Sequence, residues 1–323
     1  MLLSVVATLY RSAPHLEQFH ARVSRAAAAV SDNYEIVLVN DGSPDGSLEV
    51  ALRLFDTDPR LRIVDLSRNF GHHKAMMTGL AHTRGDLVFL IDSDLEEQPE
   101  LLGEFHTLLT RSGADVVYGV QQARRGGLLE RVSGWLFFKL FNALSNQPIP
   151  ANLVTVRLMT QRYVRALVAH RERETMIAGL WALTGFRQVA QPIMKASRGD
   201  SSYSFRRKLS LLVDSITSFS DRPLIFIFYL GLAIGGTASL AAVYLVIQRL
   251  FFGQALPGWP SLIVSIWMLG GLMLICLGII GIYVSRIFIE TKQRPYTIVG
   301  HVYERTGDPS VAPDSAERRT VLR

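Results

Sequence analysis

Acidic side chains recur in this chain at points where an apolar run ends. Asp92 and Asp94, one residue apart, directly follow the run 87–91, and Asp41 begins a second acidic turn after the run 35–39. Two aspartates at this spacing can present oxygens to one divalent cation, and such a cation can bridge the phosphates of a nucleotide. A lone D-x-D is also common in solvated turns and at helix starts. The position after an apolar run, together with the second acidic turn, favours the cation site.

The elements that must position these turns are short apolar runs that alternate with amphipathic stretches. Such alternation predicts a parallel α/β sheet with right-handed crossovers. We expect strands at Leu3–Leu9, Glu35–Val39, Arg62–Asp65 and Leu87–Ile91, and helices at Leu16–Val30, Ser47–Phe55 and Lys74–His82. Ligands of such sheets bind beyond the carboxyl ends of the strands, so the acidic turns mark the expected site.

The composition narrows the class of protein. The chain has 323 residues, of which 49% are hydrophobic and 19% charged, whereas soluble domains average about 25% charged residues. The length excludes a small disulfide scaffold, and the apolar content excludes a disordered chain. The one cysteine, Cys276, excludes an intramolecular disulfide and a cysteine metal cluster. The fold therefore suits a reducing compartment.

Two apolar runs near the C-terminus, Leu224–Ile247 and Leu262–Ile287, are almost without charge. A helix of about 20 apolar residues crosses a hydrocarbon layer about 30 Å thick. Burial in a soluble core is a weak explanation for two adjacent runs of this length. We therefore predict a transmembrane hairpin in a multi-pass protein of the cytoplasmic (inner) membrane. Basic residues flank the hairpin at Arg206, Arg207, Lys208 and Arg222, and at Arg286, Lys292 and Arg294. This distribution predicts that the first 208 residues and both termini are cytoplasmic.

The formal net charge of +6 suits nucleic acid, a lipid surface or a phosphorylated substrate. Because the basic residues gather beside the apolar runs and no recognition motif occurs, we expect a lipid bilayer and no nucleic acid. Glycines along both runs would let two helices approach closely, so a homo-oligomer stays open.

Several short motifs follow one another in order along nearly the whole chain. They are Asn40–Ser43, Ser67–Gly71, Gly85–Asp86, Asp92–Leu95, Ser133 to Asn142, Val156–Met159 and Arg198 to Ser204. This order resembles the family-two glycosyltransferases of the GT-A fold. With the two apolar runs, the chain is similar to the polyprenyl-phosphate glycosyltransferases. That group includes bacterial undecaprenyl-phosphate sugar transferases and dolichol-phosphate mannose synthases.

The resemblance implies a domain order and an activity. We expect a Rossmann-like GT-A nucleotide-sugar domain at 1–208, an amphipathic juxtamembrane helix at 209–222, two transmembrane helices at 223–290 and a cytoplasmic tail at 291–323. The implied reaction is inverting transfer of a sugar from a nucleotide-sugar donor to a polyprenyl phosphate, undecaprenyl phosphate in bacterial members. Mg²⁺ or Mn²⁺ would be the cofactor. The product would supply lipid-linked sugar for modification of cell-envelope glycans, including lipopolysaccharide.

The same resemblance implies roles for single residues. Asp92 and Asp94 would be metal ligands, with Asp94 the direct one. The implied catalytic residues are Asp94, Arg124, Arg131, Ser133 and Arg198. The implied substrate-binding residues are Thr8, Tyr10, Asp41, Arg68, Lys74, Asp92 and Arg157. Asp41 would contact the base or ribose, and the arginines in the catalytic set would hold the donor diphosphate and the acceptor phosphate. For Lys74, a solvated lysine at a helix start is an equally good interpretation.

Two other pairs of residues near these motifs have plainer interpretations. His72 and His73 follow Gly71 without a third ligand at suitable spacing, so a loop or nucleotide-side role is favoured over metal binding. Glu96 and Glu97 suit the first turn of a following helix, where its dipole favours acidic groups.

The chain also departs from the family's motifs. Thr8–Ser12 stand where the family has Pro-x-Tyr-Asn-Glu, so its acidic residue is missing, and Glu96 replaces the glutamine of D-x-D-L-Q. These departures leave open a non-catalytic membrane homologue that scaffolds a flippase partner. A polysaccharide synthase of the same superfamily is the other alternative. Two spans form too small a channel for a synthase, and no Gln-x-x-Arg-Trp motif occurs.

Overall fold

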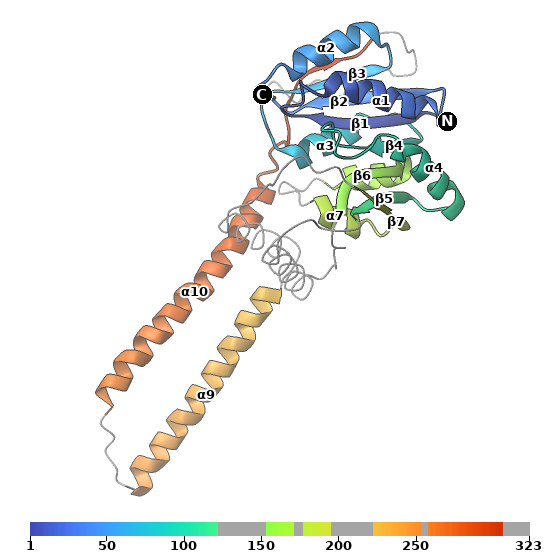
Figure 1. Ribbon diagram of the computed structural model, residues 1–323. Coiled ribbons are helices and arrows are strands. Elements are labelled where there is room, and N and C mark those ends of the chain that lie inside the picture. Colours follow the sequence, from blue (N-terminus) through green and yellow to red (C-terminus); the bar gives the residue numbers. More distant parts are fainter. Residues whose placement is uncertain (122–152, 171–176, 195–221, 253–257, 306–323) are drawn as a thin grey trace. The chain divides into compact units, whose positions relative to one another are not determined.

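The structure is a computed structural model that describes residues 1–121, 153–170, 177–194, 222–252 and 258–305 (Figure 1). The chain divides into two compact units. Unit 1 consists of Met1–Val117, Thr155–Val164 and Thr297–Arg323, and unit 2 consists of Tyr118–Val154 and Arg165–Tyr296.

Unit 1 is built from alternating strands and helices, as predicted. Its first seven elements are β1 (Leu3–Leu9), α1 (Leu16–Ala28), β2 (Tyr34–Asn40), α2 (Ser47–Thr57), β3 (Leu61–Leu66), α3 (His72–Ala81) and β4 (Leu87–Leu90). They are followed by α4 (Leu101–Ser112), the start of β5 (Val116–Gln121), β6 (Leu153–Thr160) and β8 (Val299–Tyr303). Each strand and helix expected in the first 91 residues is present within a few residues of its predicted bounds.

The strands of unit 1 form a mixed sheet that includes the order β6-β4-β1-β2-β3-β8. The strands β4, β1, β2 and β3 are parallel, whereas β6 and β8 run antiparallel to their neighbours. Every residue of β1 is buried, as expected for a strand of a parallel sheet that is covered on both faces. In register, Val6 lies between Val37 of β2 and Leu90 of β4.

Helices cover both faces of this sheet. The chain moves across the sheet in one direction from β1 to β3 and then returns past β1 to β4. Right-handed crossovers therefore put α1 and α2 on one face and α3 on the other. The contact of α3 with the sheet is close, because a Cβ on Gly79 would lie 2.6 Å from a methyl of Val6 and 2.8 Å from a methyl of Val39. The direction changes between β1 and β4, which is where sheets of this kind bind ligands.

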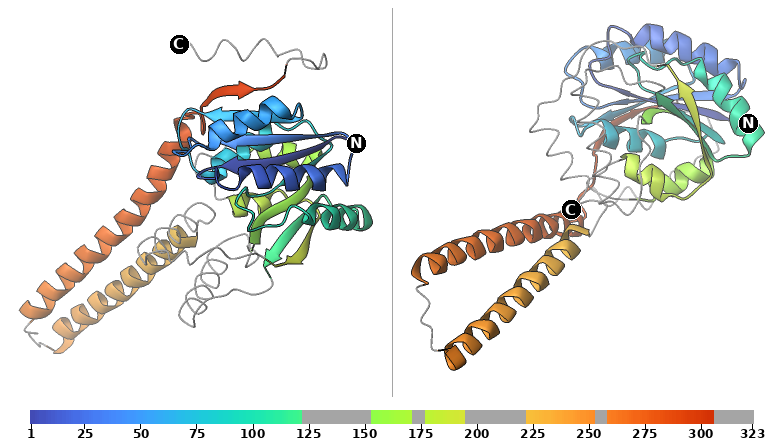
Figure 2. Two further views of the ribbon diagram at one scale, coloured as in Figure 1. Left: turned by 45° about the horizontal axis from the view of Figure 1, so that its top comes forward. Right: turned by 60° about the horizontal axis from the view of Figure 1, so that its bottom comes forward.

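β8 adds an edge strand from far along the chain (Figure 2). It pairs antiparallel with β3, with Val302 opposite Val64. The carboxylate of Glu304, directly after β8, lies 3.3 Å from the Nε of Arg62 and 2.9 Å from the guanidinium of Arg84. The sequence does not predict this strand, which lies in the range expected to form a tail.

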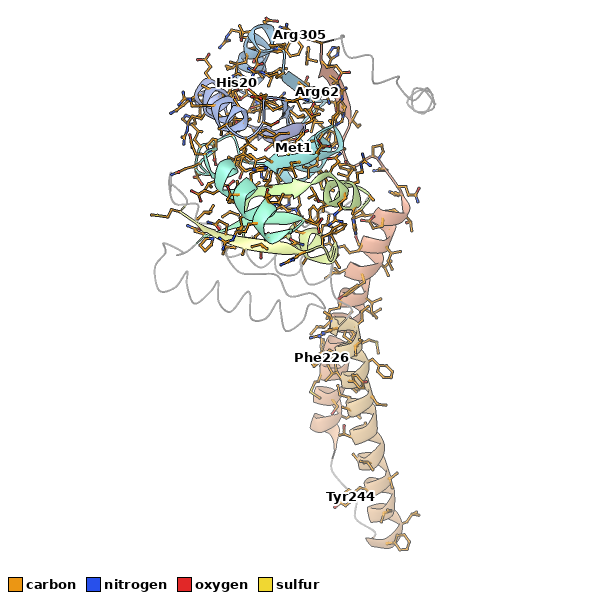
Figure 3. All side chains as sticks on the ribbon, turned by 90° about the vertical axis from the view of Figure 1, so that its right-hand side faces the viewer. Met1, His20, Arg62, Phe226, Tyr244 and Arg305 are labelled. Carbon is orange, nitrogen blue, oxygen red and sulfur yellow. The ribbon has the colours of Figure 1, made fainter. Side chains whose placement is uncertain are left out.

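Unit 2 contains the end of α6 (Gln161–Val168), α7 (Ile177–Leu183), β7 (Gln188–Ile193), α9 (Arg222–Phe252) and α10 (Trp259–Thr291). α9 and α10 are long helices that expose apolar side chains, such as Phe226 and Tyr244 on α9 (Figure 3). Ser265–Thr291 of α10 is long and apolar enough to cross a membrane, and its apolar part is not buried in the protein. In α9, residues Arg222–Ala238 form a further apolar stretch.

These apolar surfaces indicate association with a membrane, with one helix that could span it among the described residues. The second span of the predicted hairpin stays a prediction. Of the predicted juxtamembrane helix, residues 209–221 lie outside the described residues, as does 306–323 of the tail.

Candidate active site

Asp41 holds the loop that leads into α3. It follows β2 and is 2% exposed, and its two carboxylate oxygens accept the backbone N–H groups of Phe70 and Gly71 at 2.7 and 3.0 Å. Burial raises the pKa of Asp41 above its ordinary value, against the opposing effect of these two hydrogen bonds. The carboxylate therefore has a structural task, and its contact with a base or ribose stays a prediction.

The turn that contains Asp92 and Asp94 lies at the carboxyl end of β4. The Asp92 side chain is 18% exposed and Asp94 is exposed, while Ser93 between them is buried. The Ser93 hydroxyl donates to the backbone C=O of Thr8 at 2.8 Å, which ties the turn to β1. Leu95 has a φ of +62°, a left-handed conformation that costs a leucine on the order of 1 kcal/mol. The shape of the turn is therefore set by its surroundings.

The end of β1 lies beside this turn. Thr8 is 7% exposed and Tyr10 is exposed. The hydroxyl of Ser12 lies 2.8 Å from that of Ser93, and Ser12 stands at the position of the missing glutamate. A contact between two hydroxyls therefore joins β1 to the turn at this position.

His72 completes this arrangement. The sequence favoured a loop or nucleotide-side role for it over metal binding, without naming its contacts. His72 begins α3, and its ring lies between the side chains of Thr8 and Asp92, 3.0 Å from the former and 3.3 Å from the latter. Burial of the ring opposes protonation, but the carboxylates of Asp92, Asp41 and Glu97 together raise the pKa of His72 above its ordinary value. The sequence does not reveal the contact of His72 with Thr8 and Asp92, because this contact depends on β1 and β4 being neighbours.

Two cations flank the loop before α3. The Arg68 guanidinium lies 4.1 Å from the centroid of the Phe70 ring and donates to the C=O of Asn69 at 3.0 Å. Lys74 lies in the first turn of α3 and is half-buried. Both lie next to the loop that Asp41 holds, and binding of substrate by either stays a prediction.

Glu97 and Arg157 are buried charges that bind the same residue. They are 0% and 1% exposed. The Oε1 of Glu97 accepts the N–H of Thr155 at 3.1 Å, and the Nε of Arg157 donates to the C=O of Thr155 at 3.2 Å. α4 begins only at Leu101, so the interpretation of Glu96 and Glu97 as first-turn helix residues is wrong. The Glu97 side chain therefore joins the acidic turn to β6, and substrate contact by Arg157 stays a prediction.

Four of the predicted catalytic residues lie outside the residues that the structure describes. They are Arg124, Arg131, Ser133 and Arg198. Their expected roles at the donor diphosphate and the acceptor phosphate therefore rest on the resemblance.

The acidic turn suits a divalent cation that is bound by the protein and by a substrate together. Carboxylate oxygens suit Mg²⁺, which proteins usually hold with one or two carboxylates, substrate phosphates and water. Asp92 and Asp94 supply such a pair. In the described part of the chain, no group of three or more His, Cys, Asp and Glu residues could hold a metal ion. A cation here would therefore complete its ligand set with water or with phosphate oxygens of the donor.

Comparison with known proteins agrees with this site. The model of the glycosyl transferase family 2 matches residues 4–167. A Mycobacterium tuberculosis protein described as a glycosyltransferase is 54% identical over 303 residues, which cover 94% of this chain and 89% of that protein. The prophage bactoprenol glucosyl transferase homolog of Escherichia coli is 32% identical over 305 residues, 94% of this chain and 99% of that protein. The bactoprenol glucosyl transferase of Shigella phage SfV is 32% identical over 302 residues, 93% and 98% of the two chains.

The chain belongs to the glycosyl transferase family 2. Together with the mixed α/β sheet, this match confirms the predicted GT-A fold class and the predicted class of enzyme, a glycosyltransferase.

Proposed function

We propose that this protein transfers a sugar, with inversion, from a nucleotide-sugar donor to a polyprenyl phosphate at the cytoplasmic membrane face. The observation that carries the proposal is the acidic turn, with Asp92 and Asp94 at the switch point of the sheet. The spanning length of α10 and the bactoprenol glucosyl transferases among the relatives support a lipid acceptor.

The acceptor needs little help from a general base, because a lipid phosphate is already anionic near neutral pH. The main barrier is electrostatic, since a diphosphate and a lipid phosphate must approach each other. In the reaction, a bond forms between an acceptor phosphate oxygen and the anomeric carbon. The bond from that carbon to the diphosphate breaks, and the nucleoside diphosphate leaves with the electron pair. A bound Mg²⁺ or Mn²⁺ would neutralise charge on this leaving group.

The protein's own residues bind and orient the two substrates in this proposal. Asp92 and Asp94 would hold the cation, with Asp94 the direct ligand because it is the more exposed carboxylate. Arg124, Arg131, Ser133 and Arg198 hold the two phosphates by charge and hydrogen bonds, which fixes them for in-line attack. The donor-side residues would be Thr8, Tyr10, Asp41, Arg68, Lys74 and Arg157.

The membrane part of the proposal adds a second span to the one candidate found among the described residues. α9 and α10 would form a hairpin of two spans, with the catalytic domain and both termini in the cytoplasm. The product would carry sugar to cell-envelope glycans. A flippase that moves the product across the membrane, and a second copy of this chain, are partners compatible with the proposal.

A transfer assay tests the proposed reaction. Membranes with the expressed protein receive radiolabelled nucleotide sugars one at a time, with undecaprenyl or dolichyl phosphate and Mg²⁺ or Mn²⁺. We expect organic-extractable label from one donor, lost in Asp94→Asn. No label from any donor, with the folded protein still binding a nucleotide sugar in a metal-dependent way, contradicts transfer to these acceptors. Failure to bind any donor supports the scaffold alternative.

A further inference from the structure

His72 joins two strand ends through its two ring nitrogens. Nδ1 lies 3.0 Å from the Oγ1 of Thr8, and Nε2 lies 3.3 Å from the Oδ1 of Asp92. Because an ionised carboxylate only accepts hydrogen bonds, Nε2 can donate to Asp92 when the ring carries its proton on that nitrogen. Nδ1 then accepts from the Thr8 hydroxyl when the ring is neutral, and donates to it when the ring is charged.

Three separate elements bring these side chains together. Side chains alternate between the faces of a strand, so Thr8 shares a face of β1 with Val6. Gly79 of α3 packs against Val6, which identifies this face as the one that α3 covers. His72 is the first residue of α3, and Asp92 follows β4, the parallel neighbour of β1. The contact is therefore a product of the sheet order.

Thr8 is a fixed anchor for the histidine ring. Its side chain is β-branched and almost wholly buried, which restricts its rotamers. Its backbone C=O accepts the Ser93 hydroxyl, so Thr8 is also bonded to the turn that carries Asp92. The His72 ring is half-exposed. Its contact with Thr8 holds one end of the ring against β1, the strand beside the one that Asp92 follows.

We infer that His72 is a positioning residue: the Thr8 hydroxyl fixes its ring, and the ring orients the Asp92 carboxylate toward the cation and diphosphate of the donor. The inference rests on the proposed function, which gives Asp92 that task. Hydrogen-bond partners behind a metal ligand orient the ligand, and their removal costs about 10- to 100-fold in metal affinity. His72 therefore acts through Asp92 and not on the reacting atoms.

Mn²⁺ alone is a suitable probe, because it needs no knowledge of the donor. The purified full chain in detergent is titrated with Mn²⁺, and unbound Mn²⁺ is followed by its electron paramagnetic resonance signal. The variants are His72→Ala, Thr8→Val, the double variant and Thr8→Ser, which keeps the hydroxyl. His73→Ala is the matched control, since its ring lies on the same turn, 5.9 Å from that of His72.

We expect His72→Ala to weaken Mn²⁺ binding about 10-fold or more. Thr8→Val should weaken it by a smaller factor, and the double variant should bind no more weakly than His72→Ala, because both changes break one chain of contacts. Thr8→Ser and His73→Ala should bind like the wild type. Melting temperatures near that of the wild type separate this result from a loss of folding. If His72→Ala does not fold, Thr8→Val compared with Thr8→Ser gives the test, because only Thr8→Val removes the hydroxyl that fixes the ring.

Unchanged Mn²⁺ affinity without His72, additive effects of the two changes, or no Mn²⁺ binding by the wild type would overturn the inference. Sugar transfer measured on the same samples distinguishes this failure from that of the proposed function. A wild type that binds Mn²⁺ through His72 but transfers no sugar to a polyprenyl phosphate contradicts the proposed function alone. An active wild type whose variants keep full Mn²⁺ affinity contradicts the inference alone.

Discussion

Gly42 packs directly against the backbone of Asn69. A Cβ on Gly42 would lie 2.4 Å from the backbone nitrogen of Asn69 and 2.5 Å from the carbonyl carbon of Arg68, and its φ is +54°. Both the conformation and the space therefore require glycine. Asp41, the preceding residue, accepts hydrogen bonds from the same loop. The loops after β2 and β3 thus form one rigid side of the site.

Gly42→Ala should destabilise the protein by about 1–3 kcal/mol, because the left-handed conformation is strained and the loop must move away. Thermal unfolding measures the effect. Gly103→Ala is the matched control, since Gly103 lies in α4 with nothing within 4 Å of an added Cβ. That change should stabilise the protein by about 0.5–1 kcal/mol. Equal melting temperatures for the two variants would contradict the packing described here.

Removal of β8 should damage unit 1, whereas removal of the residues after Arg305 should not. A chain that ends at Tyr296 exposes the edge of β3 and removes Glu304 from the buried Arg62. Because Arg62 keeps Glu35 at 3.4 Å, the loss of Glu304 alone costs on the order of 1 kcal/mol. We expect a lower melting temperature or aggregation for this chain, and wild-type behaviour for one that ends at Arg305.

The same experiment has an internal control in the full-length Glu304→Gln variant, which keeps the strand and loses the charge. Its melting temperature should lie between those of the wild type and the chain without β8. If the chain that ends at Tyr296 melts like the wild type, β8 does not stabilise unit 1.

Asp45 should make the stability depend on pH in the acid range. Its carboxylate accepts the N–H groups of Ala13 and Ser47 and the hydroxyl of Ser43. Burial alone would raise the pKa of Asp45, but these hydrogen bonds outweigh it and lower the pKa. The ionised carboxylate therefore stabilises the fold above the unfolded-state pKa of about 3.9, and this stabilisation is lost as pH falls through the lower folded-state pKa.

Melting temperatures between pH 3 and 6 test this expectation. The difference between the wild type and Asp45→Asn should be largest near pH 6 and should shrink as the pH approaches 3. A difference that stays constant over this range would show that the Asp45 charge has no part in stability.

The parallel core was predictable because its strands carry continuous apolar runs and each ends in a polar turn. The run Leu3–Leu9 matches β1 residue for residue. β8 was not predictable, because its five residues follow a long apolar helix and become a strand only through pairing with β3. A strand at the edge of a sheet takes much of its order from its neighbour and little from its own pattern.

The candidate site was predictable to the level of its acidic turns. Asp41, Asp92 and Asp94 follow strands that the sequence predicts. Because these strands are parallel, the three side chains are expected at the same edge of the sheet. The role of His72 was not predictable, because it depends on which strand neighbours β4 and on the face of β1 to which Thr8 points. Thr8 stands where the resembled motif has proline, so the motif does not predict the hydroxyl that contacts His72.

Asp94→Asn should reduce sugar transfer by on the order of 100-fold or more, because a cation ligand contributes several kcal/mol. Folding should change little, since Oδ1 of Asp94 accepts the N–H of Glu96 at 2.9 Å and an asparagine oxygen can accept the same bond. Glu96→Gln is the matched control and should keep activity, because it restores the residue of the resembled motif. Transfer rates on folded protein measure both. Near-normal transfer by Asp94→Asn would contradict the role given to Asp94.

The most direct test of the central claim is the mass of the lipid product. Purified protein is incubated with undecaprenyl phosphate and a panel of nucleotide sugars with Mn²⁺, and the extracted lipid is analysed by mass spectrometry. We predict a lipid that gains one sugar and no phosphate, with release of the nucleoside diphosphate. A lipid that gains a sugar phosphate with release of the nucleoside monophosphate, or donor consumption with no change in the lipid, would contradict it.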